Sequence, residues 1–157
     1  MAPRYDFKKQ RLFIRIYAVA QVVLIGLLIY MAVYFQAGLT AQGRSQRFFH
    51  SVVTALVLQL ALFYPINRFA GREARREIDA SAVGLDPDEL KSFRTKRMIG
   101  DTCKWAYFIF FVAFIYKAPK DLFVLSIIFF TFVLTSLSYF QCYNFTVKRL
   151  MKEKEQR

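Results

Sequence analysis

The chain of 157 residues is 56% hydrophobic and 18% aromatic, and its formal net charge is +12. A soluble domain of about this length buries only about two-thirds of the surface that its unfolded chain exposes. Such a domain cannot hide 18 Phe and 9 Tyr together with the long apolar runs found here. The composition excludes an ordinary soluble enzyme, a disordered tail and a disulfide-rich secreted domain. It favours one integral membrane domain over residues 1–157.

Three uncharged runs are long enough to cross a bilayer, which takes about 20 apolar residues. They cover residues 16–35, 48–67 and 122–147. A fourth run, Trp105–Tyr116, has only 12 uncharged residues between two lysines. It spans the bilayer only if those lysines extend their ammonium groups into the headgroup layers.

The distribution of basic residues decides the number of spans. With four spans, 19 of the 23 Lys and Arg residues fall on one side of the membrane. With three spans, the C-terminal tail and the basic central segment lie on opposite sides. The positive-inside rule therefore selects four spans with both termini in the cytoplasm. We predict an all-α four-transmembrane-helix bundle with spans at about residues 12–35, 48–70, 98–117 and 121–146.

The central segment between the second and third spans carries helix signals. Asp86-Pro87 is typical of a helix start, with Asp as N-cap and Pro at the first helical position. Gly84 fits the stop of the preceding helix. We therefore expect the second helix to end at about Ser81 and a charged cytoplasmic helical hairpin to cover about residues 71–97. Its arms are expected to be held together by five apolar side chains: Ile78, Val83, Leu85, Leu90 and Phe93.

Five polar residues lie at membrane depth in this topology and form the candidate site. Asp101 and Lys104 are three residues apart on one helix face, so they can pair. An ionisable group inside a membrane is a functional candidate, although an ion pair can also simply fix a helix at its depth. Arg68 is expected at the same depth. Gln21 and Gln59 lie deeper and either line an aqueous path or hydrogen-bond between helices.

Residue counts argue against most cofactors and against catalysis. One His and two Cys do not suffice for bis-histidine haem ligation or a usual structural zinc site. Glycine-rich phosphate loops and hydrolase motifs are absent. The acidic residues of the central segment, Glu73 and Glu77 among them, are interpreted as helix caps and as partners of neighbouring arginines. We therefore expect no catalytic, cofactor or metal site and no enzymatic activity.

The basic residues predict anionic lipids as partners, because they cluster where the helices leave the membrane. No separate basic domain remains for nucleic acid. The strong charge bias and the lack of a recognisable cleaved signal peptide suit a bacterial inner (cytoplasmic) membrane. The expected contacts with lipid headgroups are made by Lys8, Lys9, Arg11, Arg15, Lys148 and Arg149.

The run Gly100-Asp101-Thr102-Cys103-Lys104 opens the third of four spans. In this it resembles ATP synthase subunit I, a family with four spans, cytoplasmic termini and a G-E-x-x-K pattern at about this place. The resemblance covers these five residues and the topology. Asp stands here for the family's Glu, and the glycine-rich second span is missing. The resemblance implies a role in membrane-complex assembly.

Two functions remain open from the sequence. The first is a non-enzymatic accessory, scaffold or assembly subunit of a larger membrane complex, which binds other membrane-protein subunits. The alternative is a homo-oligomeric ion channel or small transporter. In that case Asp101, Lys104 and Gln59 would line the path.

Overall fold

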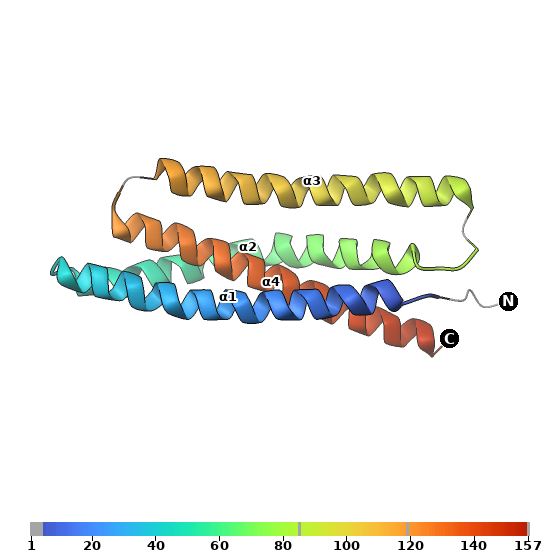
Figure 1. Ribbon diagram of the computed structural model, residues 1–157, viewed down its shortest axis with the longest axis horizontal. Helices are drawn as coiled ribbons and strands as arrows, with labels where there is room; N and C mark the ends of the chain where they lie inside the picture. Colours follow the sequence, from blue (N-terminus) through green and yellow to red (C-terminus); the bar gives the residue numbers. More distant parts are fainter. Residues whose placement is uncertain (1–4, 85, 119, 157) are drawn as a thin grey trace.

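The computed structural model describes residues 5–84, 86–118 and 120–156. These residues form four long helices that alternate in direction along the chain (Figure 1). Each helix contains an 18-residue stretch that is apolar enough to cross a membrane. The prediction of an all-α chain with four long apolar helices is therefore confirmed. The helices are α1 (Lys8–Ala41), α2 (Ser45–Asp79), α3 (Pro87–Lys117) and α4 (Leu122–Glu155).

The alternation of the helices gathers the basic stretches of the chain at one end of the bundle. The start of α1, the end of α4 and the connection from α2 to α3 all lie at that end (Figure 1). The α1–α2 and α3–α4 connections lie at the opposite end. We call the first end the basic end and the second the far end.

The core near the basic end lies between α2 and α4. Ala70, Ala74 and Ile78 of α2 recur every four residues and are almost fully buried against Tyr143 and Val147 of α4. This spacing places the three side chains on one helix face. The two alanines let the backbones approach closely, as small residues do at helix contacts in membranes.

A second apolar cluster lies toward the far end and joins α1, α2 and α4. It contains Phe35, Ala55 and Phe130, with the rings of Phe35 and Phe130 edge to face at 5.8 Å. Gly38 allows α1 to approach the start of α4 here, because a Cβ at this position would lie 2.8 Å from Leu122 Cδ1. Helix α1 is thus packed at both of its ends.

The connection between α2 and α3 is short and tied to the N-terminal segment. Helix α2 ends at Asp79, two residues before the expected Ser81. Gly84 has a φ of +93°, in the region that favours glycine. Asp86 is extended before Pro87 at the start of α3, as the sequence predicted, although its side chain makes no capping hydrogen bond. The backbone N–H of Asp6 donates to the carbonyl of Ser81 at 3.0 Å.

The expected apolar contact between the arms of the central segment is wrong for Ile78, whereas Phe93 is half-buried and lies with Val83 and Leu90 beside the space between α2 and α3. Ile78 faces α4 and Phe7 instead of α3. Val83 and Leu90 are 60% and 50% exposed, and Leu85 lies outside the described residues. The physical reason is that Ile78 belongs to the same face of α2 as the two buried alanines, and α4 covers that face.

Helix α3 lies at the periphery of the bundle (Figure 1). Gly100 is its one buried residue among those described. In its apolar half, Tyr107 and Phe111 place their rings 5.6 Å and 5.0 Å from the ring of Phe132 of α4. The Tyr107 hydroxyl also donates to the Phe132 carbonyl at 3.0 Å. Most of the remaining aromatic surface of α3 is exposed.

Candidate functional site

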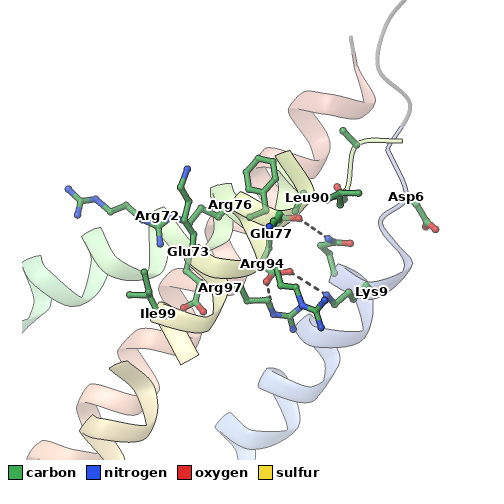
Figure 2. A pocket seen from close by; sticks show the side chains of 18 of the residues that line it. Asp6, Lys9, Arg72, Glu73, Arg76, Glu77, Leu90, Arg94, Arg97 and Ile99 are labelled. Atoms are coloured by element: carbon green, nitrogen blue, oxygen red, sulfur yellow. Dashed lines mark hydrogen bonds and ion pairs between the residues drawn. The ribbon is translucent and has the colours of Figure 1, made fainter. Parts of the chain in front are cut away.

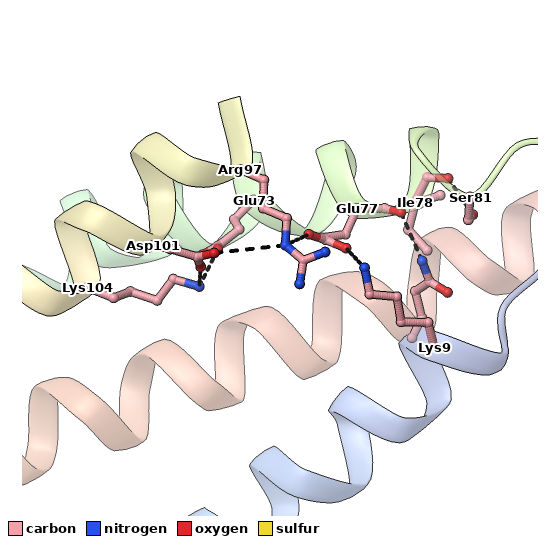
Figure 3. Close-up of polar contacts among 9 residues, drawn as sticks. Lys9, Glu73, Glu77, Ile78, Ser81, Arg97, Asp101 and Lys104 are labelled. Carbon is pink, nitrogen blue, oxygen red and sulfur yellow. Dashed lines mark hydrogen bonds and ion pairs between the residues drawn. The ribbon is translucent and has the colours of Figure 1, made fainter. Parts of the chain in front are cut away.

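The predicted pair of Asp101 and Lys104 is present, and it contacts a third charge that comes from α2. Lys104 Nζ lies 2.9 Å from Asp101 Oδ1 and 2.5 Å from Glu73 Oε1 (Figure 3). The Glu73 side chain is only 12% exposed. A Cβ at position 100 would lie 3.4 Å from Glu73 Oε1. Gly100 thus leaves room for this carboxylate against the backbone of α3.

A second acidic residue of α2 links α3 to α1. Glu77 Oε1 lies 3.3 Å from Arg97 Nε, and its other oxygen lies 3.8 Å from Lys9 Nζ. Arg97 Nε is also 3.9 Å from Asp101 Oδ2. The Gln10 amide of α1 donates to the backbone carbonyl of Glu77 at 3.0 Å. These contacts continue the first group of charges along the helices, as Figure 3 shows.

The hydroxyl of Tyr139 connects this network to α4 by a short hydrogen bond to Glu73 Oε2. Tyr17 of α1 packs on the same region, with its ring 6.3 Å from that of Tyr139 and 5.0 Å from that of Tyr143. Glu73 therefore contacts α3 through Lys104 and α4 through Tyr139. All four helices meet within one or two contacts of this carboxylate.

We call this set of charges the ion-pair chain; it consists of Lys9, Glu77, Arg97, Asp101, Lys104 and Glu73. Its acids from α2 are mostly shielded from solvent, so their interactions are screened less than those of surface pairs. A half-buried charge that loses its partner is strongly destabilising. The geometry can therefore fix α3 in depth and rotation against α2.

Gln59 forms a separate polar contact in the middle of the bundle. Its amide nitrogen donates to Ser138 Oγ at 2.6 Å, and its oxygen accepts from Thr135 Oγ1 at 2.9 Å. Both partners belong to α4, and Gln59 is 9% exposed. Both ends of the amide thus make hydrogen bonds between helices. Of the two roles considered from the sequence, this is the interhelical hydrogen bond and not the lining of an aqueous path.

The other two candidates are not brought into either polar group. Arg68 is exposed and Gln21 is half-buried. Within the described ranges, neither side chain has a hydrogen bond or ion pair with another residue. The five predicted residues therefore divide into a pair at the ion-pair chain, one interhelical amide and two separate side chains.

Sequence reasoning missed the two acids at the centre of the site. It assigned Glu73 and Glu77 to arginines close by on α2, whereas the structure pairs them with Lys104, Arg97 and Lys9 of other helices. Spacing was the available signal. Glu73 and Glu77 are four residues apart, and Arg97 and Lys104 are seven apart, so each pair lies on one helix face.

The predicted lipid-contact residues lie at the basic end, and all six are exposed. Three of them also have acidic partners. Lys9 belongs to the ion-pair chain, Arg11 lies 3.3 Å from Glu155, and Arg149 lies 3.6 Å from Glu153. Lys8, Arg15 and Lys148 have no acidic partner within the described chain.

Within residues 5–84, 86–118 and 120–156, no three His, Cys, Asp or Glu side chains gather as a metal site would require. Cys103 and Cys142 are both free thiols. Four apolar helices of bilayer length define the class: this is an integral membrane protein of all-α architecture. No protein-family model, curated protein or solved structure matches the chain.

Proposed function

We propose that the protein is a non-enzymatic accessory, scaffold or assembly subunit of a larger complex in a bacterial inner membrane. In this proposal α3 contacts a neighbouring membrane subunit, and the charged ends of α2 and α3 project into the cytoplasm. The observation that carries it is the short uncharged run of α3 together with its largely uncovered apolar half.

The uncovered surface of α3 is large and aromatic. Trp105, Phe110 and Tyr116 are 66%, 58% and 85% exposed. By contrast, α4 has nine buried residues among those described. Lipid can cover an apolar helix, so exposure alone does not favour a protein partner.

The length of α3 adds the decisive argument. Its uncharged run of 12 residues measures about 18 Å at about 1.5 Å per residue, against a hydrocarbon core of about 30 Å. Membranes accommodate such a short span by thinning, by extended lysines at its ends, or by association with other helices. The ion-pair chain holds Lys104 at one end of this run, so this lysine is not free to extend into the headgroups. Association of α3 with a helix of another subunit is therefore favoured.

The membrane orientation follows from the distribution of charge. The basic residues of α1, α4 and the central segment meet at one end of the bundle. The positive-inside rule assigns that end to the cytoplasm. Both termini and the α2–α3 connection would then lie on the cytoplasmic side.

The channel alternative has less support from the geometry. It needs Asp101, Lys104 and Gln59 to line one path. Lys104 instead pairs with Glu73, and Gln59 bonds to two hydroxyls of α4. A path through these groups would have to break contacts that already satisfy them.

Site-specific photocross-linking in native membranes tests the proposal. A benzophenone amino acid replaces Phe110 of α3 or, as a matched control, Val22 of α1, which is 70% exposed. We expect the probe at position 110 to give an adduct with one different membrane protein, which also co-purifies with the unmodified chain at fixed stoichiometry. The control at position 22 should give only lipid adducts.

Two results contradict the proposal. An adduct of the chain with itself alone, together with a particle at a small multiple of 18.5 kDa, would favour the channel. A particle of one chain with no protein adduct from position 110 would remove the reason to assign a partner to α3.

A further inference from the structure

A cavity of about 1070 Å³ opens between α2 and α3 at the basic end, beside the N-terminal segment. Figure 2 shows side chains of both helices around it, with Arg72 and Arg76 from α2 and Arg94 and Arg97 from α3. The cavity exists because the apolar face of α2 is turned to α4 instead of α3. We call it the basic cleft.

The basic cleft has an excess of positive charge. Seven Lys or Arg side chains and three acidic side chains line it. Two of the acids, Glu73 and Glu77, are already paired with Lys104, Arg97 and Lys9. The third, Asp6, accepts a hydrogen bond from the backbone N–H of Lys8. Five lining cations have no acidic partner in the part of the chain that the structure describes: Arg72, Arg76, Lys91, Arg94 and Lys96.

Apolar side chains line the basic cleft at its membrane end, and also near the α2–α3 connection, where Val83, Leu90 and Phe93 lie. Phe69 and Ile99 line it where the predicted spans end. Arg72 lies three residues beyond Phe69, and Arg76 lies seven beyond it, which corresponds to about 5 Å and about 10 Å along α2. The polar headgroup layer of one leaflet is about 5 to 8 Å thick. When the apolar end of the cleft meets the hydrocarbon, Arg72 therefore lies within the headgroup layer and Arg76 lies just beyond its outer edge.

We propose that the basic cleft binds the phosphate headgroup of an anionic phospholipid, whose acyl chains leave past Phe69 and Ile99. Arginine presents a fork of donors that fits phosphate oxygens in a bidentate way. Arg72 and Arg76 on α2 and Arg94 on α3 hold such forks on opposite walls. A soluble anion would use the cations but not the apolar end. This site rests on the membrane placement proposed above and needs no protein partner.

Bound lipid also explains how α2 and α3 tolerate their facing charges. Like charges on neighbouring helices repel, and the ion-pair chain fixes only one side of the cleft. A phosphate between the helices neutralises the remaining cations. Basic pockets of this kind between helices on the cytoplasmic side bind anionic headgroups in other membrane proteins.

Native mass spectrometry of the full chain measures the site directly. The protein is purified in mild detergent and titrated with phosphatidylglycerol or with phosphatidylcholine of the same acyl chains. We expect one or two phosphatidylglycerol molecules to be retained preferentially. The triple variant Arg72→Gln, Arg76→Gln and Arg94→Gln should weaken this binding by about 100-fold at low salt, since each basic group contributes roughly fivefold.

A matched control removes the same charge from the same end of the bundle but outside the cleft, at residues that are not expected headgroup contacts: Arg68→Gln, Arg75→Gln and Lys152→Gln. These three side chains are exposed, and we expect less than a threefold change. An equal loss in both variants would overturn the site, because it would show general attraction to a basic surface. Equal retention of the two lipids by the native chain would overturn it as well.

Two further arms complete the test. Lysine at all three cleft positions keeps the charge and should bind more tightly than the glutamine variant. If the lysine and glutamine variants lose phosphatidylglycerol binding equally, while circular dichroism shows unchanged helix content, the role of charge is refuted. Inorganic phosphate that displaces the lipid at equal concentration would refute a lipid site and indicate a soluble anion.

Discussion

Replacement of Glu73 by Gln tests the central claim that a half-buried carboxylate of α2 holds α3 in place. The change keeps the size of the side chain but removes the charge that Lys104 contacts at 2.5 Å. Loss of one partner from a buried pair costs about 3–5 kcal/mol. Lys104 keeps Asp101 at 2.9 Å and is 32% exposed, so we expect a smaller loss of about 2 kcal/mol.

Two measurements report this loss. Equilibrium unfolding in mixed micelles with rising SDS, followed by circular dichroism, gives the free energy of unfolding. Hydrogen exchange shows where the loss occurs, because α3 can separate without global unfolding. A loss of about 2 kcal/mol corresponds to about 30-fold faster exchange of the backbone amides of residues 97–104.

The matched control is Glu153→Gln on α4. Glu153 pairs with Arg149 at 3.6 Å, but its side chain is 59% exposed. Exposed helix pairs contribute about 0.5 kcal/mol or less. Equal effects of the two substitutions on unfolding and on α3 exchange would refute the reasoning. In the double variant Glu73→Gln/Lys104→Met, removal of both charges should recover part of the loss.

Three other substitutions or treatments test the packing of the bundle. Gln59→Leu should lower the free energy of unfolding by about 1 kcal/mol, since it removes two interhelical hydrogen bonds. The control Gln21→Leu should change it by less than about 0.5 kcal/mol. A larger loss for Gln21→Leu than for Gln59→Leu would contradict the polar contact at Gln59. Ala74→Leu should lower the free energy of unfolding by about 3 kcal/mol or more, because this alanine is fully buried between α2 and α4. The control is Ala18→Leu at an exposed position. Similar melting temperatures for the two variants would contradict the α2–α4 contact. Trypsin added to the cytoplasmic face of native membranes should cut residues 72–82 slowly, since most of that segment is helical; rapid cleavage there would show an unstructured loop.

The general architecture could be read from the sequence because membranes impose simple rules. Uncharged runs of about 20 residues can only be helices in lipid, where every backbone group must be bonded internally. The start of α3 at Asp86-Pro87 was equally readable, since proline tolerates the first helical position and few others. The pairing of Asp101 with Lys104 is local, being set by a spacing of three residues on one helix.

The tertiary structure alone decided which helix faces meet. The sequence placed Ile78 against α3, but the repeat of small side chains on α2 packs against α4. That choice exposes the charged face of α2 to α3, brings Glu73 and Glu77 to Lys104 and Arg97, and leaves the basic cleft open. Periodicity shows that residues share a face, but not which neighbour covers it. The rotation of a helix depends on packing against all its neighbours at once, and contacts over long sequence separations carry that information.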